Sequence, residues 1–407
     1  MDHSDLQQKL AGIHSHISSV AGVEDCDLRS DRYQLMASAL EAVLCRNFAG
    51  AYCLKRTFYS WDYCHGGARL DQQRLTDPLP VTGFGTEESS DTVDRERLLF
   101  FDTETTGLGG AGVVPFLIGC GSYTAGGIEV RQYIIPDYSD EAAMLEALLE
   151  ELIPSTVLVT YNGKAFDIPI VRDRMIVNRV AREIPASDHL DLLHATRRLF
   201  SRRLADCSLT NVERELFDFH RQDDIPGFLI PSVYFEWLGQ QKLDLLHNVL
   251  EHNCLDIVSL AFLTEKIAGI FADHGHSLSS AQDLHSLARV YGRRRQTDRV
   301  NRLYRRIIDE GSGDLPADAV WFHSLALKRS GQMDEALRLW GTLAEGEGKE
   351  SYLAHLELAK HYEHRLKQPR QALSQTLQAD QKCPYGTAHH RRLEHRVQRL
   401  KQKAGLS

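Results

Sequence analysis

Apolar and polar positions divide the chain into three parts, of which the middle part has the clearest pattern. Between residues 97 and 272, short apolar runs alternate with segments of helical periodicity, which is typical of an α/β domain. The apolar runs predict buried strands at residues 98–101, 115–123, 128–135 and 156–160. A helix capped by Ser139 is expected before the last strand, so that strand should lie parallel to a neighbour.

The first part, residues 1–95, is harder to interpret. Its periodicity predicts one helix from Asp31 to Phe48 and a strand at residues 51–59. Residues 78–94 are rich in Pro, Gly, Ser and acidic residues, which is typical of a linker. We therefore predict an N-terminal extension and linker at residues 1–95, followed by an α/β domain at residues 96–275.

The third part, residues 280–407, contains an internal repeat of helical hairpins. Small and aromatic residues recur at corresponding places: Ala288, Tyr291 and Val300 in the first copy, Ser324, Leu327 and Ala336 in the second, and Ala359, Tyr362 and Ala372 in the third. Such residues let paired helices approach closely and stack. The pattern resembles the tetratricopeptide repeat over roughly residues 285–385, which implies an all-α domain that binds a protein partner. A final helix rich in Arg and Lys would form a cap or a basic tail.

Composition places the chain among globular proteins: 43% of the 407 residues are hydrophobic and 25% are charged. The N-terminus lacks a basic region followed by an apolar run, and no stretch has the length of a membrane span. We expect a cytoplasmic protein that does not bind membranes. Residues 281–407 carry a charge of +8 and the remainder −17. The basic part is either a surface that attracts phosphate groups or an ordinary solvated helical surface.

The eight cysteines are scattered without a CxxC spacing, which favours reduced thiols in a cytosolic protein. Four of them lie between Cys26 and Cys64, next to His65. An iron–sulfur or zinc site is the alternative for this group, but its spacing is irregular.

Acidic side chains follow two of the predicted strands. Asp102 and Glu104 are two residues apart at the end of the first strand, so they share a face, where like charges repel unless a cation lies between them. Asp167 follows the strand at 156–160, and open sheets place their sites at such strand ends. His252 and Asp256 are four apart on a predicted helix and also share a face. The alternatives are a polar turn for the first pair and a helix N-cap for Asp167.

The ordered motifs resemble the DEDD superfamily of 3′-to-5′ exonucleases. The stretch DTETTGL at residues 102–108 and the stretch YNGKAFDIP at residues 161–169 are similar to its first two motifs, and His252 and Asp256 stand in the place of the third. The resemblance is strongest to the YprB-like branch, whose patterns match at residues 191–194, 207–213, 223–227 and 252–257.

The resemblance implies a ribonuclease-H-like mixed sheet flanked by helices. It also implies a metal-dependent nuclease that hydrolyses single-stranded DNA or RNA from the 3′ end with two Mg²⁺ or Mn²⁺ ions. Four residues would be the metal ligands: Asp102, Glu104, Asp167 and Asp256. Four others would contact substrate: Thr105, Asn162, Lys164 and Asn253.

The third motif departs from the family pattern. Members that use a histidine base place it five residues before the last Asp, where this chain has Glu251. His252 occupies the position that other members give to tyrosine, and we predict that it acts as the base or orients the water. Two other functions remain open at this point: a repeat-based scaffold whose nuclease-like domain binds nucleic acid without cutting it, and a structure-specific endonuclease.

Overall fold

The computed structural model describes residues 24–70, 77–81, 84, 92–107, 112–181, 183–186, 188–310, 315–384 and 387–406 of the 407, and for residues 24–30 it describes the backbone alone. The chain forms two compact units. The first comprises Met1–Arg197 and Leu204–Phe271, and the second comprises Arg198–Arg203 and Ala272–Ser407. In the predicted linker at residues 78–94, residues 82, 83 and 85–91 lie outside the described residues.

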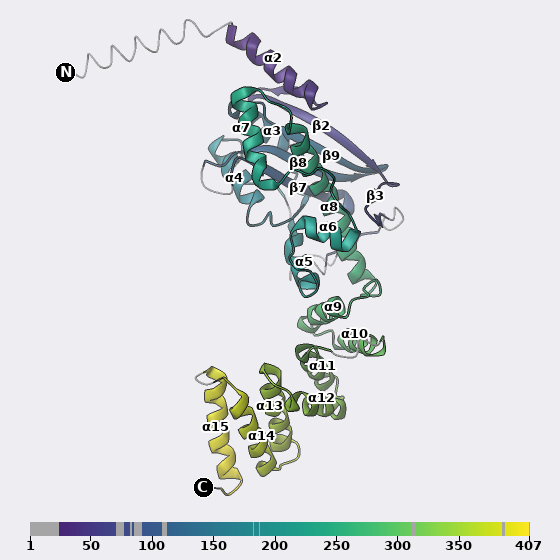
Figure 1. Cartoon of the computed structure of the whole chain (residues 1–407), viewed down its shortest axis with the longest axis vertical. Helices are drawn as coiled ribbons and strands as arrows, with labels where there is room; N and C mark the ends of the chain where they lie inside the picture. Colours follow the sequence, from purple (N-terminus) through teal and green to yellow (C-terminus); the bar gives the residue numbers. More distant parts are fainter. Residues whose placement is uncertain are drawn as a thin grey trace, which may run out of the picture. The chain divides into compact units, whose positions relative to one another are not determined.

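The first unit is built on a seven-stranded mixed sheet (Figure 1). From one edge to the other its strands are β1 (Val43–Asn47), β2 (Gly50–Ser60), β9 (Gly127–Ile134), β8 (Pro115–Thr124), β7 (Leu98–Thr105), β10 (Val157–Thr160) and β11 (Asp188–Asp191). Neighbours from β1 to β7 are antiparallel, whereas β10 is parallel to β7 and β11 is parallel to β10. The mixed sheet confirms the predicted α/β class.

Strands β7, β8 and β9 form a meander, and α3 (Glu141–Leu148) supplies the crossover to β10. The crossover helix begins at Glu141, one residue later than predicted. Asp140, not Ser139, is the N-cap residue of α3, and its side chain makes no capping hydrogen bond there. The Asp137 carboxylate caps the 3₁₀ turn that precedes the helix, by accepting a hydrogen bond from the Ser139 backbone N–H at 3.1 Å. Aspartate takes the capping position because its short carboxylate reaches the free amides of the first turn.

Helices pack against the two faces of β7. Leu99 and Phe101 belong to a core cluster that includes side chains of α4 (Asp167–Val177) and α7 (Ile230–Gln240). Phe100 points to the opposite face, because neighbours along a strand alternate. The side chain of Ile257, on α8 (Leu246–Ala272), lies on that face beside Gly121. The even-numbered positions of β7 therefore face α8.

The N-terminal part differs from the sequence prediction. Helix α2 spans Glu24–Ala39, and the residues expected to continue it form β1 instead. Glu41, with a φ of 54°, breaks the helix, and β1 then pairs with β2. Because β2 pairs with β9 along eight residues, residues 43–60 belong to the central sheet rather than to a separate extension.

Shorter elements complete the first unit. Two small hairpins are formed by β3 (Cys64–His65) with β4 (Ala68–Arg69), and by β5 (Leu79–Pro80) with β6 (Thr92–Val93). The other helices are α5 (Leu192–Phe200), which ends in the second unit, α6 (Leu209–Phe217), and the 3₁₀ turns Arg95–Arg97, Tyr138–Asp140 and Gly227–Leu229.

The second unit is all-helical among its described residues. Its helices are α9 (Ala281–Arg293), α10 (Thr297–Asp309), α11 (Ala317–Arg329), α12 (Met333–Glu345), α13 (Lys349–His364), α14 (Pro369–Lys382) and α15 (Ala388–Lys403). The repeat positions are buried in each copy, except that Tyr362 is partly buried. This agrees with close helix packing at those positions, while the assignment to tetratricopeptide repeats stays a prediction.

The described cysteines bear on the predicted metal chemistry. Seven are free thiols, and Cys26 lies outside the described side chains. In the part of the chain that the structure describes, the group of side chains arranged to share a metal ion is Glu104, His252 and Asp256, without a cysteine. No helix among the described residues has the length and apolar character needed to cross a membrane.

Candidate active site

The four predicted acids converge at the end of the central strand. Asp102 and Glu104 are partly exposed on β7, between neighbours that are buried. Burial, and then the nearby charges of Asp256, Asp167 and Glu104, raise the pKa of Asp102 well above its ordinary value. The pKa of Glu104 is raised by burial and by Asp256 and Asp167. Three separate segments thus bring four carboxylates into one electrostatic cluster, which favours a bound cation.

Asp167 is the first residue of α4, immediately behind the parallel strand β10. Its Oδ1 accepts a hydrogen bond of 2.5 Å from the hydroxyl of Thr103, on β7. Burial raises the pKa of Asp167 to about 6, against the opposing effect of the Thr103 hydroxyl. The hydrogen bond fixes this carboxylate beside Asp102 and Glu104.

Asn253 holds Asp102 in place. Its Nδ2 donates to Asp102 Oδ2 at 2.9 Å, and its Oδ1 accepts from Gln132 Nε2 at 2.9 Å. Asn253 is 0% exposed. Both ends of its amide are used inside the protein, which gives Asn253 a positioning role toward Asp102, and a contact with substrate stays a prediction.

Gly119 makes room for this amide. It pairs with Asp102 across β7 and β8, and a Cβ at Gly119 would lie 2.3 Å from Asn253 Oδ1. A side chain there would displace α8 or the Asn253 amide, so the glycine permits the close approach that brings α8 to Asp102.

His252 faces carboxylates on both sides of its ring. Its Nδ1 lies 2.7 Å from Asp224 Oδ1, and its Nε2 lies 3.7 Å from Asp256 Oδ2. The ligand atoms of Glu104, His252 and Asp256 all lie within 4.8 Å of one another. The structure thus places His252 in the acidic cluster, as the sequence predicted, and adds Asp224.

A buried arginine stands directly behind the cluster. The Arg221 side chain is 2% exposed and contacts the Asp256 carboxylate. It also makes a two-pronged pair with Glu213, whose side chain is 0% exposed: Nε to Oε2 at 2.8 Å and Nη2 to Oε1 at 2.6 Å. Such a planar pair has a defined orientation. Arg221 therefore fixes the position of Asp256.

The network continues to the N-terminal hairpin. Ser259, on α8, donates to Glu213, and His65 Nε2 lies 2.9 Å from the Ser259 hydroxyl. The His65 ring stacks on Phe219 with centroids 3.8 Å apart. Gly66, with a φ of 60°, passes so close to the Phe217 carbonyl that a Cβ would lie 2.2 Å from it. The segment that carries β3 is thereby linked, through hydrogen bonds, to the Glu213–Arg221 pair that supports Asp256.

His65 makes the stability of this unit depend on pH. Burial, and then the charge of Arg221, lower its pKa to about 3 from 6.5. As the pH falls below 6.5 the unfolded chain binds a proton that the folded chain excludes, so stability is lost toward pH 3, by at most about 1.4 kcal/mol per pH unit. We expect His65→Gln to reduce the fall in Tm between pH 7.5 and pH 5, measured by circular dichroism.

Other histidines with lowered pKa values act in the same direction on the whole protein, so the variant reduces the dependence without abolishing it: His189 in the first unit, and His285 and His323 in the second. The matched control is His220→Gln at an exposed histidine, which should preserve the wild-type pH dependence. An unchanged dependence in His65→Gln would contradict the assignment.

The other predicted substrate contacts fall into two groups. Asn162 and Lys164 are exposed on the loop after β10, and their backbone N–H groups donate to the buried Asp191 carboxylate at 2.9 and 3.1 Å. Thr105 is buried, and its hydroxyl donates to the Gly107 carbonyl at 2.7 Å. Thr105 therefore shapes the turn after β7 rather than facing solvent.

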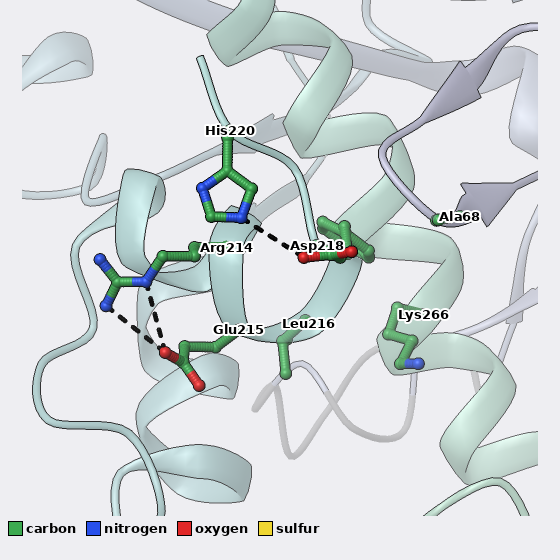
Figure 2. A pocket seen from close by; sticks show the side chains of 9 residues that line it. Ala68, Arg214, Glu215, Leu216, Asp218, His220 and Lys266 are labelled. Atoms are coloured by element: carbon green, nitrogen blue, oxygen red, sulfur yellow. Dashed lines mark hydrogen bonds and ion pairs between the residues drawn. The ribbon is translucent and has the colours of Figure 1, made fainter.

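An open hollow of about 650 Å³ lies on another part of this unit (Figure 2). Figure 2 shows His220 paired with Asp218 and Arg214 paired with Glu215, with Lys266 on the other side. The charges around the hollow are mixed, and none of its lining residues is a predicted site residue. None of its lining residues belongs to the acidic cluster.

Sequence reasoning missed Glu213, Arg221 and Asp224. Glu213 and Asp224 lie within the stretches 207–213 and 223–227, which match family patterns. The match pointed to these residues but did not indicate what they do. A charged residue in a polar loop is usually solvated, and only the fold shows that Arg221 is buried.

The chain is similar to one protein family and to individual known proteins. The RNase_H superfamily matches residues 99–268. YprB, an uncharacterized protein of Bacillus subtilis (strain 168), is 33% identical over 364 residues, which cover 88% of this chain and 87% of that protein. A family B DNA polymerase from the hyperthermophilic archaeon Pyrobaculum calidifontis has 12% identity and a TM-score of 0.35, over 78% of this chain and 47% of the polymerase. With an RNase_H superfamily domain that carries the converging acids, the chain belongs to the YprB family.

Proposed function

We propose that this protein is a metal-dependent nuclease that hydrolyses phosphodiester bonds of single-stranded nucleic acid from the 3′ end. The observation that carries the proposal is the convergence of Asp102, Glu104, Asp167 and Asp256 from three separate segments. Membership of the RNase_H superfamily suggests a nucleic-acid-cleaving enzyme. The 3′-to-5′ direction rests on the resemblance of the motif stretches.

The donor set suits hard divalent ions. Carboxylate oxygens are the ligands that Mg²⁺ and Mn²⁺ prefer. The pKa values of Asp102 and Glu104 are raised because burial and the neighbouring carboxylates disfavour their charged forms when no cation is bound. The four carboxylates would hold two ions. Bound there, the ions supply charge neutralisation at the phosphate and activation of water.

The protein's own contribution is to fix these ligands before substrate arrives. Asn253 orients Asp102, and Thr103 orients Asp167, each through one hydrogen bond. Preorganised groups lose little energy to rearrangement during the reaction. Lys164, exposed on the loop that leads to Asp167, is proposed to hold a backbone phosphate of the strand, as is the neighbouring Asn162.

The test is cleavage of matched DNA and RNA oligonucleotides labelled at either end, with Mg²⁺, with Mn²⁺ or with a chelator. We expect metal-dependent stepwise shortening from the 3′ end by the wild type, loss of cleavage in Asp256→Asn, and wild-type cleavage in Asp218→Asn. Asp218 is a fair control because it is exposed and has a φ of 53°, which asparagine tolerates.

Three results would count against the proposal. Oligonucleotides that stay intact under every metal condition, with the fold retained, would exclude cleavage. The alternative hypothesis of a scaffold that binds nucleic acid without cutting it would then remain. Internal cuts would indicate a structure-specific endonuclease instead of an exonuclease. Full activity in Asp256→Asn would show that this carboxylate of the acidic cluster is not needed for cleavage. That the C-terminal repeats bind a protein stays a prediction from the sequence.

A further inference from the structure

The ring of His252 is held in one orientation. Asp224 Oδ1, at 2.7 Å, is close enough to accept the proton of Nδ1. Arg221 Nη1 also lies near Nδ1, but at 3.3 Å, so Asp224 is the closer partner. With its proton on Nδ1, the neutral ring carries its lone pair on Nε2.

That lone pair lies among the acids. Nε2 is 3.7 Å from Asp256 Oδ2, and the ligand atoms of Glu104, His252 and Asp256 lie within 4.8 Å of one another. Two ligands that each lie about 2.1 Å from one ion are about 3.0 Å apart at a right angle and at most about 4.2 Å apart. The separation between His252 and Asp256 falls in this range.

We propose that His252 Nε2 is a direct ligand of a divalent ion shared with Glu104 and Asp256, and that Asp224 is the residue that positions it. This is an alternative to the sequence prediction that His252 acts as the base or orients the water. The ion would occupy a mixed nitrogen and oxygen site, which favours Mn²⁺ over Mg²⁺, since Mg²⁺ strongly prefers oxygen.

The surrounding contacts agree with this assignment. Metal-binding histidines usually donate their second ring N–H to a carboxylate, which is the arrangement of His252 and Asp224. Arg221 contacts Oδ1 of Asp256, so Oδ2, the oxygen nearer to His252, is the one left for an ion. The cluster therefore presents one nitrogen and two carboxylates to a common point.

The inference refines the metal site of the proposed nuclease and is tested without nucleic acid. Mn²⁺ is added to the full-length protein, and electron spin-echo envelope modulation detects ¹⁴N nuclei bonded to the ion. We expect an imidazole nitrogen signal in the wild type and its loss in His252→Gln. The control His220→Gln, at an exposed histidine whose ring pairs with Asp218, should keep the signal.

Isothermal titration supplies a second readout. Asp224→Asn should weaken Mn²⁺ binding about 10- to 100-fold, the usual effect of removing such a partner. His252→Gln should weaken Mn²⁺ more than Mg²⁺, so the preference between the two ions narrows. Circular dichroism confirms that each variant is folded.

The wild-type spectrum decides the matter even where a variant fails to fold. Absence of a nitrogen signal from bound Mn²⁺ would overturn the inference, as would a signal that persists in His252→Gln. A nitrogen signal in a protein that cleaves no oligonucleotide would support the ligand assignment and refute the nuclease proposal, so the two failures are distinguishable.

Discussion

Asp102→Asn is expected to abolish metal-dependent cleavage and at the same time to stabilise the metal-free protein. Activity should fall by roughly 10³-fold or more, because the carboxylate is central to the proposed ion sites. The raised pKa of Asp102 means that its charge opposes folding at neutral pH, and asparagine removes that charge. Asparagine can still accept the hydrogen bond from Asn253.

The measurement is the Tm with a chelator present, alongside the cleavage assay. Each 1 kcal/mol of relief raises the Tm of a unit of this size by about 2–4 °C. Added Mn²⁺ should raise the Tm of the wild type and have less effect on Asp102→Asn. The control Asp218→Asn, whose carboxylate is 89% exposed, should change neither property. A lower Tm of Asp102→Asn in chelator would contradict the prediction.

Arg221→Met is expected to be among the most destabilising single changes in the first unit. It would leave Glu213 buried with no cation, and losing one member of a buried pair costs about 3–5 kcal/mol. Burial already raises the pKa of Glu213, and Arg221 opposes that rise. Urea unfolding would measure the loss, and hydrogen exchange would locate it in α6 and α8.

The double variant Arg221→Met with Glu213→Gln separates the buried charge from lost packing. Part of the lost stability should return, because the unpaired carboxylate is gone. Arg172→Met, at an arginine with a 52% exposed side chain paired with Asp173, is the control and should change stability by no more than about 0.5 kcal/mol. A double variant less stable than Arg221→Met would refute this account.

The strands were predictable where burial was complete. Leu98 to Phe101 form an uninterrupted apolar run, and such a run has few alternatives to a buried strand. The boundary between α2 and β1 was missed because the apolar residues from Leu35 to Leu44 fit helical spacing. Pairing of β1 with β2, which periodicity does not record, decides the outcome there.

The acids were predictable because each follows a recognisable strand or shares a helical face with His252. Their supports were not, since a hydrogen bond such as that from Asn253 to Asp102 joins residues 151 positions apart. Asn253 was expected at the substrate because the family resemblance implied it. Only the position of Gly119, which lets the helix descend onto the strand, shows that this amide is enclosed.

The pairing of β2 with β9 has a practical consequence for dividing the protein. A fragment that began at residue 96, after the predicted linker, would lack both β1 and β2. Strand β9 would then present its backbone amides and carbonyls to solvent along eight residues, and exposed edges of this kind promote aggregation. It would also lack His65 behind Glu213 and Arg221. Expression of the first unit by itself should therefore start before Glu24.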